Sequence, residues 1–162
     1  MEIVIASIAD IEELTQVEIE SKLRSFTTNE AYAVDLEHRL RGWQTYFAAQ
    51  TPASAKPERI VYKALENDNI IGFIAVHLTT RYNLDAEIQT FYILKAYQRK
   101  GIGSKPLNEA LKWLSKFKAE SLCVGIFPEN PYKSFYLKHG GQYLNPHWIY
   151  WDNMEDLGNK IE

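Results

Sequence analysis

The sequence has little of what marks secreted, membrane-spanning or metal-binding proteins. Its 162 residues include one cysteine, Cys123, which excludes an internal disulfide and fits a reducing cytoplasm. No apolar run approaches the roughly 18 residues of a membrane span, and residues 1–5 lack the basic leader and apolar core of a signal peptide. The four histidines are scattered without ligand spacing. We therefore expect a cytoplasmic protein with no metal site.

An excess of positive charge is also missing. The 18 Lys and Arg residues against 21 Asp and Glu residues give a net charge of −3 at pH 7, which argues against nucleic acid or an anionic membrane as a partner. The composition, 46% hydrophobic and 24% charged, is that of an ordinary globular protein. The length and the lack of internal repeats predict a single domain, residues 1–162.

Hydrophobic periodicity predicts strands and helices in the order β-α-α-β-β-β-α-β-α-β-β. The strands are expected at residues 3–5, 59–65, 70–78, 88–94, 121–127, 142–144 and 147–151, and the helices at about 10–23, from about 30, at 107–117 and at 131–138. Asp10 is the expected N-cap of the first helix, with Glu13 at the capping-box position. The polar tail 153–162 is expected to fray.

The segment 87–118 combines an apolar strand, a turn with two glycines and two cations, and an amphipathic helix. The turn is Gln98-Arg99-Lys100-Gly101-Ile102-Gly103. The first backbone N–H groups of a helix have no intrahelical partner, and they can bind phosphate where glycines remove the intervening Cβ atoms. The turn therefore predicts a phosphate site, although a plain strand-to-helix turn with incidental lysines can contain the same glycines.

Two common phosphate-binding motifs are absent from this turn. It lacks the Gly-Lys-Ser/Thr ending of a P-loop and the third glycine of a dinucleotide fingerprint. The segment from Gln98 to Gly103 resembles instead the Q/R-x-x-G-x-G/A pyrophosphate loop of the GNAT superfamily, the acyl-CoA-dependent N-acyltransferases, as do the flanking Tyr97 and Ser104. Pro106 departs from the family, which more often has leucine there, but a proline in the first helical turn forfeits no intrahelical hydrogen bond.

The resemblance extends to the order of elements along nearly the whole chain. It implies the GNAT fold, which is α/β (α+β mixed): an α/β/α architecture around a central mixed, mostly antiparallel sheet with splayed strands 4 and 5, which leave a slot for pantetheine. It also implies acetyl-CoA as cosubstrate and direct transfer of its acetyl group to a primary amine of a small molecule or peptide. The alternatives are a non-catalytic acyl-CoA-binding module on the same fold and an unrelated nucleotide-binding domain.

The same resemblance assigns the groups that would bind acetyl-CoA. The pyrophosphate would lie against Gln98, Arg99, Lys100, Gly101, Ile102, Gly103 and Ser104. Pantetheine would pair with the backbone of Phe91, Tyr92 and Ile93, and the Ile93 amide would polarise the acyl carbonyl. Asn130 either caps a helix only or also hydrogen-bonds pantetheine. Lys133 and Lys138 are either solvated or close to the 3′-phosphate of the nucleotide.

Tyr136 is the candidate proton donor to the departing thiolate. It lies in the segment 130–141, which resembles the family's N-x-x-A-x-x-x-Y-x-x-x-G-F region apart from its edges. The resemblance implies that this tyrosine acts as the acid. Alternatively, Tyr132, Phe135 and Tyr136 form a packing stripe at helical spacing.

Glu87 is the candidate base. It lies six residues before Ile93, where some family members carry a catalytic glutamate. Strand alternation places Glu87 on one face with Gln89, Phe91 and Ile93, toward the slot, and burial there would make the carboxylate readier to take a proton. The alternatives are an exposed strand-end carboxylate beside Asp85, and an ordered water in place of a dedicated base.

The acceptor side carries weaker signals. Four aromatic residues are candidates for its lining or for the core, namely Phe26, Tyr32, Trp43 and Tyr46. Four acidic residues would attract a cationic amine or serve only solubility, namely Glu30, Asp35, Glu37 and Asp85. The aromatic end, Trp148, Tyr150 and Trp151, predicts either an edge that pairs across a homodimer or a strand of the core.

Overall fold

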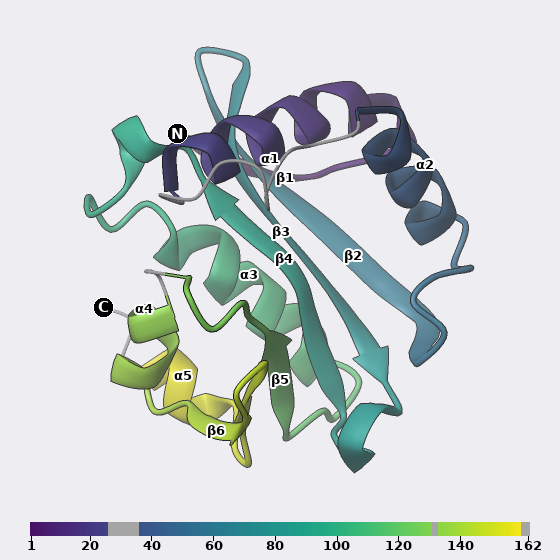
Figure 1. Ribbon diagram of the computed structural model, residues 1–162, viewed down its shortest axis with the longest axis vertical. Coiled ribbons are helices and arrows are strands. Elements are labelled where there is room, and N and C mark those ends of the chain that lie inside the picture. The colour runs from purple at the N-terminus through teal and green to yellow at the C-terminus, as the bar shows by residue number, and fades with distance from the viewer. Residues whose placement is uncertain (26–35, 131–132, 160–162) are drawn as a thin grey trace.

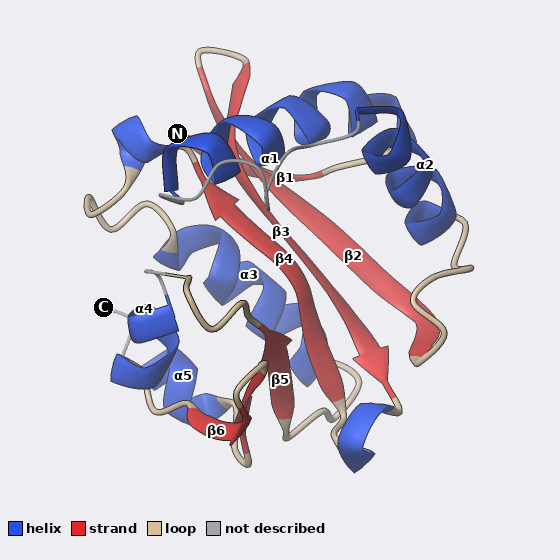
Figure 2. Ribbon diagram, in the orientation of Figure 1, coloured by secondary structure: helices blue, strands red, loops and turns tan. Residues whose placement is uncertain are grey.

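The computed structural model describes residues 1–25, 36–130 and 133–159, which form a seven-stranded sheet with helices on both faces (Figures 1 and 2). The strands are β1 (Glu2–Ile5), β2 (Ala55–Glu66), β3 (Asn69–Thr79), β4 (Ala86–Ile93), β5 (Leu122–Gly125), β6 (Gln142–Asn145) and β7 (Trp148–Trp151). The helices are α1 (Ile11–Ser25), α2 (Leu36–Phe47), α3 (Ser104–Ser115), α4 (Lys133–Lys138) and α5 (Glu155–Asn159), with 3₁₀ turns η1 (Ile8–Asp10), η3 (Arg81–Asn83) and η4 (Lys95–Tyr97). Within these described ranges, no helix is long and apolar enough to cross a membrane.

The sheet is mixed and mostly antiparallel, as the sequence predicts. Its strand order is β1-β2-β3-β4-β5-β7-β6, and only β4 and β5 run parallel. The aromatic strand β7 lies between β5 and β6, with Ile149 and Trp151 in the core. The expectation that the aromatic end forms an edge of the sheet is therefore wrong, because β6 occupies that edge.

Each face of the sheet has its own hydrophobic core. On one face, Trp43 of α2 packs against Phe73 of β3, with 5.4 Å between ring centroids. On the other face, Leu107 of α3 belongs to the cluster that includes Ile74 and Ile88. Successive side chains of a strand point to opposite faces, so the adjacent residues Phe73 and Ile74 contribute to different cores.

The N-terminal cap differs from the one expected. Ser7 is the N-cap of η1: its hydroxyl accepts a hydrogen bond from the Ala9 amide, and the Asp10 carboxylate accepts one from the Ser7 amide at 2.8 Å. Asp10 thus occupies the N3 position of a capping box and is not its N-cap. Glu13 instead accepts a hydrogen bond from the Ile70 amide at 2.8 Å, which ties α1 to β3.

The tail is ordered further than its polar composition indicates. Residues 155–159 form α5, and Met154 and Leu157 are buried in the core on the α3 side. The Met154 amide also donates to the Glu120 carbonyl at 2.7 Å. The expectation of fraying is wrong as far as residue 159, because two apolar side chains three positions apart are enough to hold the segment against the sheet.

The pairing between β4 and β5 ends early. The register joins Ala86 to Leu122, Glu87 to Cys123 and Ile88 to Val124, and β4 then continues to Ile93 without a strand on that side among the described residues. Residues 89–93 keep β3 as their neighbour on the other side. The two strands therefore splay apart, as the sequence predicts, and one edge of β4 is left open inside the sheet.

A β-bulge lies where the strands separate. Thr90 pairs with Ala75 and Ile88 pairs with Val76, so Gln89 is an extra residue in β4. Phe91 accordingly belongs to the core on the α3 side, whereas Glu87 contacts residues on the α1–α2 side, as described below. The expectation that Glu87, Phe91 and Ile93 share one face is wrong, because the extra residue reverses the alternation.

The close packing of β3 on β4 gives a test of this register. A Cβ atom at Gly72 would lie 2.8 Å from the Tyr92 carbonyl oxygen and would also overlap the Ile93 side chain. We expect Gly72→Ala to lower the free energy of unfolding by about 1–3 kcal/mol, because the backbone has to move. Urea denaturation measures this change.

Gly42→Ala is the matched control. Gly42 lies inside α2, and a Cβ atom there would meet nothing within 4 Å. Alanine should raise the free energy of unfolding there by up to about 1 kcal/mol, because it is the better helix former. A Gly72→Ala variant as stable as Gly42→Ala would contradict the strand register.

Candidate functional site

The loop after β4 is fixed to the open end of that strand. The Leu94 amide donates to the Ile71 carbonyl at 2.9 Å, and the Gln98 side-chain amide donates to the Ile93 carbonyl at 2.7 Å. The second bond joins the first residue of the loop to the last residue of the strand. Residues 98–103 and the start of α3 are therefore held beside the open edge of β4.

The loop presents backbone rather than side chains at the start of α3. Arg99 and Gly101 have left-handed φ values of 60° and 73°, a conformation that glycine adopts without steric cost. Gly103 is the N-cap of α3 and makes no side-chain capping bond, and the Ser104 hydroxyl donates back to the Gly101 carbonyl at 2.6 Å. Among the described residues, no side chain caps the start of α3. Pro106 has no N–H group and the Lys105 amide donates to the Ile102 carbonyl at 3.2 Å, so the Ser104 amide and the loop amides before it are the groups that can bind an anion.

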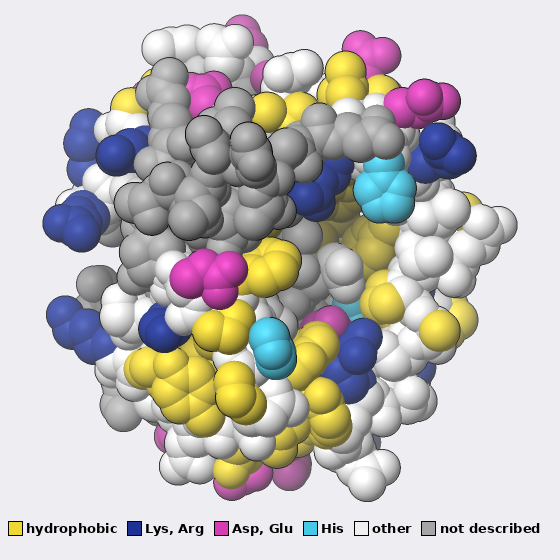
Figure 3. All heavy atoms as spheres, viewed as in Figure 1, with side chains coloured by type: hydrophobic (Ala, Val, Ile, Leu, Met, Phe, Trp, Pro, Cys, Tyr) yellow, Lys and Arg dark blue, Asp and Glu magenta, His cyan; other side chains and the backbone are white. Residues whose placement is uncertain are grey.

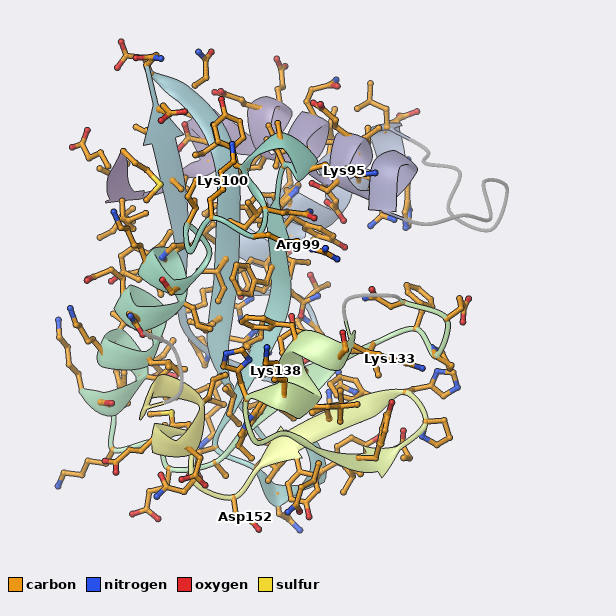
Figure 4. All side chains as sticks on the ribbon, turned by 90° about the vertical axis from the view of Figure 1, so that its left-hand side faces the viewer. Lys95, Arg99, Lys100, Lys133, Lys138 and Asp152 are labelled. Carbon is orange, nitrogen blue, oxygen red and sulfur yellow. The ribbon has the colours of Figure 1, made fainter. Side chains whose placement is uncertain are left out.

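Cations surround this loop. Arg99 and Lys100 are exposed, and the Lys100 ammonium lies 6.0 Å from the centroid of the Tyr97 ring. Figure 4 shows Arg99 and Lys100 on one side and Lys133 and Lys138 of α4 on the other side of the space beyond the open strand edge. The Lys133 ammonium donates a hydrogen bond to the Pro128 carbonyl, so it is already tied to the segment before α4.

Tyr136 lies in the core on the α3 side. Its ring makes edge contacts with Trp151, at 5.9 Å between centroids, and with Phe135, which in turn contacts Phe91 of β4 at 6.3 Å. Burial raises the pKa of Tyr136, so its phenol stays protonated at neutral pH. The expected aromatic packing is thus present for Phe135 and Tyr136, and it does not conflict with a role as a proton donor.

Tyr92 and Tyr136 lie on opposite faces of the sheet, Tyr92 on the α1–α2 side and Tyr136 on the α3 side. Burial is the main cause that raises the pKa of Tyr92, and electrostatic interactions with Glu18 and with Tyr136 raise it further. The raised pKa values keep both phenols protonated at neutral pH.

Glu87 is the centre of a buried polar cluster on the α1–α2 side. Its Oε2 atom lies 3.1 Å from Nε2 of His77, 3.2 Å from Nε of Arg81 and 3.5 Å from the Thr79 hydroxyl. On the far side of the imidazole, Nδ1 lies 3.1 Å from the Tyr46 hydroxyl. Glu87 is 3% exposed, so the alternative of an exposed strand-end carboxylate is wrong.

The two oxygens of the Glu87 carboxylate differ in their contacts. Every hydrogen bond that the described residues make to this carboxylate falls on Oε2, and none falls on Oε1. Figure 3 shows the face of the molecule on this side hollowed below α2, with acidic, basic and histidine side chains around the hollow. One oxygen is thus held by the protein and the other can accept a proton.

Sequence reasoning missed His77, Thr79 and Arg81 as members of this cluster. The histidines lack the spacing of metal ligands, but spacing along the chain does not show a partner on another strand. The available signal is the β3–β4 hairpin, in which His77 pairs directly with Glu87. Tyr46, a candidate for the acceptor lining, is a buried residue bonded to His77.

The remaining predicted residues have structural roles or lie outside the described ranges. The Asn130 carbonyl accepts from the Lys133 amide at 3.3 Å, in keeping with a helix-capping position. Trp43 belongs to the core, and Glu37 pairs with Arg41 at 3.7 Å. Five residues lie outside the described ranges, namely Phe26, Glu30, Tyr32, Asp35 and Tyr132. Among the described residues, no three His, Cys, Asp or Glu side chains gather as metal ligands would.

A family model described as acetyltransferase (GNAT) family matches residues 17–140, which run from within α1 to just beyond the end of α4. The chain belongs to this family. The GNAT match includes the open edge of β4, the 98–104 loop and Tyr136. A comparison with curated protein sequences finds no match.

Solved GNAT structures share the fold of this chain. The PaiA N-acetyltransferase of Thermoplasma acidophilum, solved with coenzyme A, is 24% identical, with a TM-score of 0.68 over 93% of this chain and 98% of its own. An acetyltransferase of Thermus thermophilus is 18% identical, with a TM-score of 0.70 over 93% and 95%. A GNAT acetyltransferase of Brucella melitensis, solved with acetyl-CoA, is 18% identical, with a TM-score of 0.62 over 93% and 86%.

Asp85 ties the start of β4 to the start of β5, and the pH dependence of stability tests this role. Its Oδ2 atom accepts from the amides of Glu120 and Ser121 at 2.9 and 3.1 Å, and these bonds, the Glu120 amide first, lower the pKa of Asp85. A lowered folded-state pKa stabilises the fold above about pH 4, and this stability is lost as the pH falls through the folded-state pKa. We expect the unfolding temperature to fall more steeply between pH 6 and 3 in the wild type than in Asp85→Asn.

The control for this pH series is Glu58→Gln, which removes an exposed carboxylate on β2. It should leave the steepness unchanged. Parallel curves for the wild type and Asp85→Asn would show that Asp85 does not clamp the start of β5.

Proposed function

We propose that the chain is an N-acetyltransferase that transfers the acetyl group of acetyl-CoA directly to a primary amine of a small molecule or peptide. The observation that carries the proposal is the open edge of β4. This edge runs from the start of α3, where glycines and cations lie, to the opening between β4 and β5. The buried phenol of Tyr136 lies on one face of the sheet there, and the buried carboxylate of Glu87 lies on the other. Acyl transfer to an amine is favoured by groups that position the acyl donor, take a proton from the amine and give one to the leaving group.

The residues along this edge fit the cosubstrate. Among the residues that the structure describes, the backbone of Phe91, Tyr92 and Ile93 has no strand neighbour on the β5 side, so it can pair with the amide-bearing pantetheine arm as with an added strand. The pyrophosphate would be held by the amides of residues 101–104 and by Arg99 and Lys100. Lys133 and Asn130 would approach from the α4 side, and Gln98 would hold the strand end in place.

Tyr136 would stabilise the departing sulfur. A phenol whose pKa is raised by burial stays protonated and can donate a hydrogen bond to the departing sulfur. Desolvation in the same buried site would raise the proton affinity of the thiolate above its value in water, so the proton would pass to the sulfur as negative charge accumulates there. The Ile93 amide would polarise the acyl carbonyl at the same time.

Glu87 would take the proton that the attacking amine loses. Its Oε2 atom is fixed by His77, Thr79 and Arg81, and its Oε1 atom is left to meet the acceptor. The base and the acid lie on opposite sides of the sheet, which suits an acceptor that enters from the α1–α2 side and a cosubstrate that enters from the α3 side.

Direct transfer is favoured over an acyl-enzyme because of the state of Cys123. Burial first, and then the charge of Glu87, raise the pKa of the Cys123 thiol to about 12. The nucleophile in such chemistry is the thiolate, and this thiol stays protonated at neutral pH. The amine itself would therefore attack the acyl carbon.

Ligand binding tests the cosubstrate. Saturating acetyl-CoA or coenzyme A should raise the unfolding temperature by several degrees, since ligand at about 100 times its dissociation constant adds roughly 2.7 kcal/mol. NAD and ATP should have no such effect.

Substitution of the loop cations tests the same site. The double variant Arg99→Ala, Lys100→Ala should bind coenzyme A about three- to tenfold more weakly, because two exposed ion pairs are lost. Lys112→Ala, on the exposed face of α3, should not weaken binding. A shift with ATP or NAD alone would contradict the proposal.

Removal of one hydroxyl tests the acid. Tyr136→Phe keeps the ring contact with Trp151 but removes the proton donor, so we expect kcat to fall by about 100-fold or more with unchanged affinity for acetyl-CoA. Tyr150→Phe, which removes a hydroxyl bonded to Gln142 on the terminal hairpin, is the control and should keep full turnover. Full turnover by Tyr136→Phe would remove this residue from the mechanism. Binding of acetyl-CoA without turnover of any amine would favour the non-catalytic module instead.

A further inference from the structure

Three buried side chains from α2, β3 and β4 form a hydrogen-bonded chain on the acceptor side of the opening. The Tyr46 hydroxyl lies 3.1 Å from His77 Nδ1, and His77 Nε2 lies 3.1 Å from Glu87 Oε2. The three side chains are 4%, 0% and 3% exposed. The cost of burying so many polar groups is recovered only if each has a partner, and in the Tyr46–His77–Glu87 chain each one does.

The partners determine where the protons lie. An ionised carboxylate only accepts hydrogen bonds, so His77 Nε2 carries a hydrogen and donates it to Glu87. In the neutral imidazole, Nδ1 then accepts from the Tyr46 hydroxyl. If the imidazole gains a second proton, Nδ1 donates to Tyr46, and the hydroxyl turns to the Val76 carbonyl, 3.3 Å away. The donation from Nε2 to Glu87 is the same in both states.

We propose that His77 is a positioning residue for the transfer reaction, which by donating from Nε2 to Glu87 Oε2 holds the carboxylate with Oε1 turned toward the acceptor amine. This inference rests on the proposed function. In the step it serves, the amine nitrogen bonds to the acyl carbon and the carbon–sulfur bond breaks. Glu87 Oε1 takes the proton that the nitrogen loses, and the sulfur takes one from Tyr136.

Other charged and titratable groups also lie beside the Tyr46–His77–Glu87 chain of hydrogen bonds. Arg81 Nε lies 3.2 Å from the same Oε2 atom of Glu87. The Arg81 guanidinium stacks over the Trp148 ring, with Cζ 4.5 Å from the ring centroid. Arg81 is about one third exposed, whereas His77 is wholly buried. Arg59 stacks on the Tyr46 ring at 4.7 Å, and Cys123, paired with Glu87 across the β4–β5 ladder, stays a neutral thiol. His77 is thus the inner support of Oε2, and Arg81 is the outer one.

Two substitutions of His77 separate orientation from packing. The side-chain amide of His77→Gln reaches the place of Nε2 and can still donate to Glu87, but that of His77→Asn reaches only the place of Nδ1. We expect kcat/KM for the amine to fall by about 10- to 100-fold in His77→Asn, as for loss of one hydrogen bond to a charged group, and His77→Gln to keep most of the rate. Glu87→Gln is the reference, and thermal unfolding and acetyl-CoA affinity are recorded for each variant.

The pH dependence of kcat/KM gives a readout that a change in packing alone would not alter. A donor stabilises the charged carboxylate, so its loss in His77→Asn should move the acid limb of kcat/KM to higher pH by about one unit. The profile of His77→Gln should stay close to that of the wild type. Thiol release from acetyl-CoA is measured with spermidine, kanamycin or a peptide with a free amino terminus as the probe, whichever the wild type turns over fastest.

The outcomes distinguish this inference from the proposed function. The positioning role alone is overturned if His77→Asn and His77→Gln lose the same amount of kcat/KM and neither moves the acid limb, while Glu87→Gln is impaired. Full activity of Glu87→Gln overturns the base and its support together. Absence of thiol release by the wild type with every probe overturns the proposed function and this inference with it. Nitrogen NMR of the His77 ring that shows the neutral Nδ1–H form would also overturn the inference, since that form cannot donate to Glu87.

Discussion

The pairing of β4 with β5 ends after three residue pairs, and the site depends on that early end. Backbone N–H and C=O groups inside a protein almost always have partners, yet within the described part of the chain residues 89–93 of β4 have a strand on one side only. Asp85 ties the start of β5 to β4, so the strands meet at one end and diverge at the other. The Gln98 bond to Ile93 then places the loop and the start of α3 at the end of the same open edge. An extended ligand with an anionic end fits such an edge.

The bulge at Gln89 gives the opening two different faces. Without the extra residue, Glu87 and Phe91 would point to the same face of the sheet. With it, Phe91 packs toward Phe135 and Tyr136, while Glu87 joins His77 and Tyr46 on the opposite side. The separation of the proposed acid from the proposed base is thus a consequence of one inserted residue at the point where the strands part.

Local features of the site could be predicted from the sequence, and pairings between distant residues could not. The strand–glycine turn–helix segment is contiguous, so its residues reveal both the loop and its charge, and the order of elements indicates the splayed sheet. The bulge depends on how β4 pairs with β3, which alternation alone does not show. Thr79 and Arg81 follow His77 along the chain, but the carboxylate that joins them, Glu87, lies on the next strand and meets them only when the hairpin is folded. Ser7 takes the place of Asp10 as the cap because both residue types cap well and the end of β1 decides between them.

Hydrogen–deuterium exchange of the backbone amides, with and without coenzyme A, tests most directly whether the open edge of β4 is the acyl-CoA site. We predict slower exchange at residues 91–93 and 101–104 when coenzyme A is bound, because a ligand pairs with the first group and an anion covers the second. Residues 142–145 of β6, at the outer edge of the sheet, should exchange at the same rate in both states. Unchanged exchange at residues 91–93 under saturating coenzyme A would contradict the assignment of this edge as the acyl-CoA site.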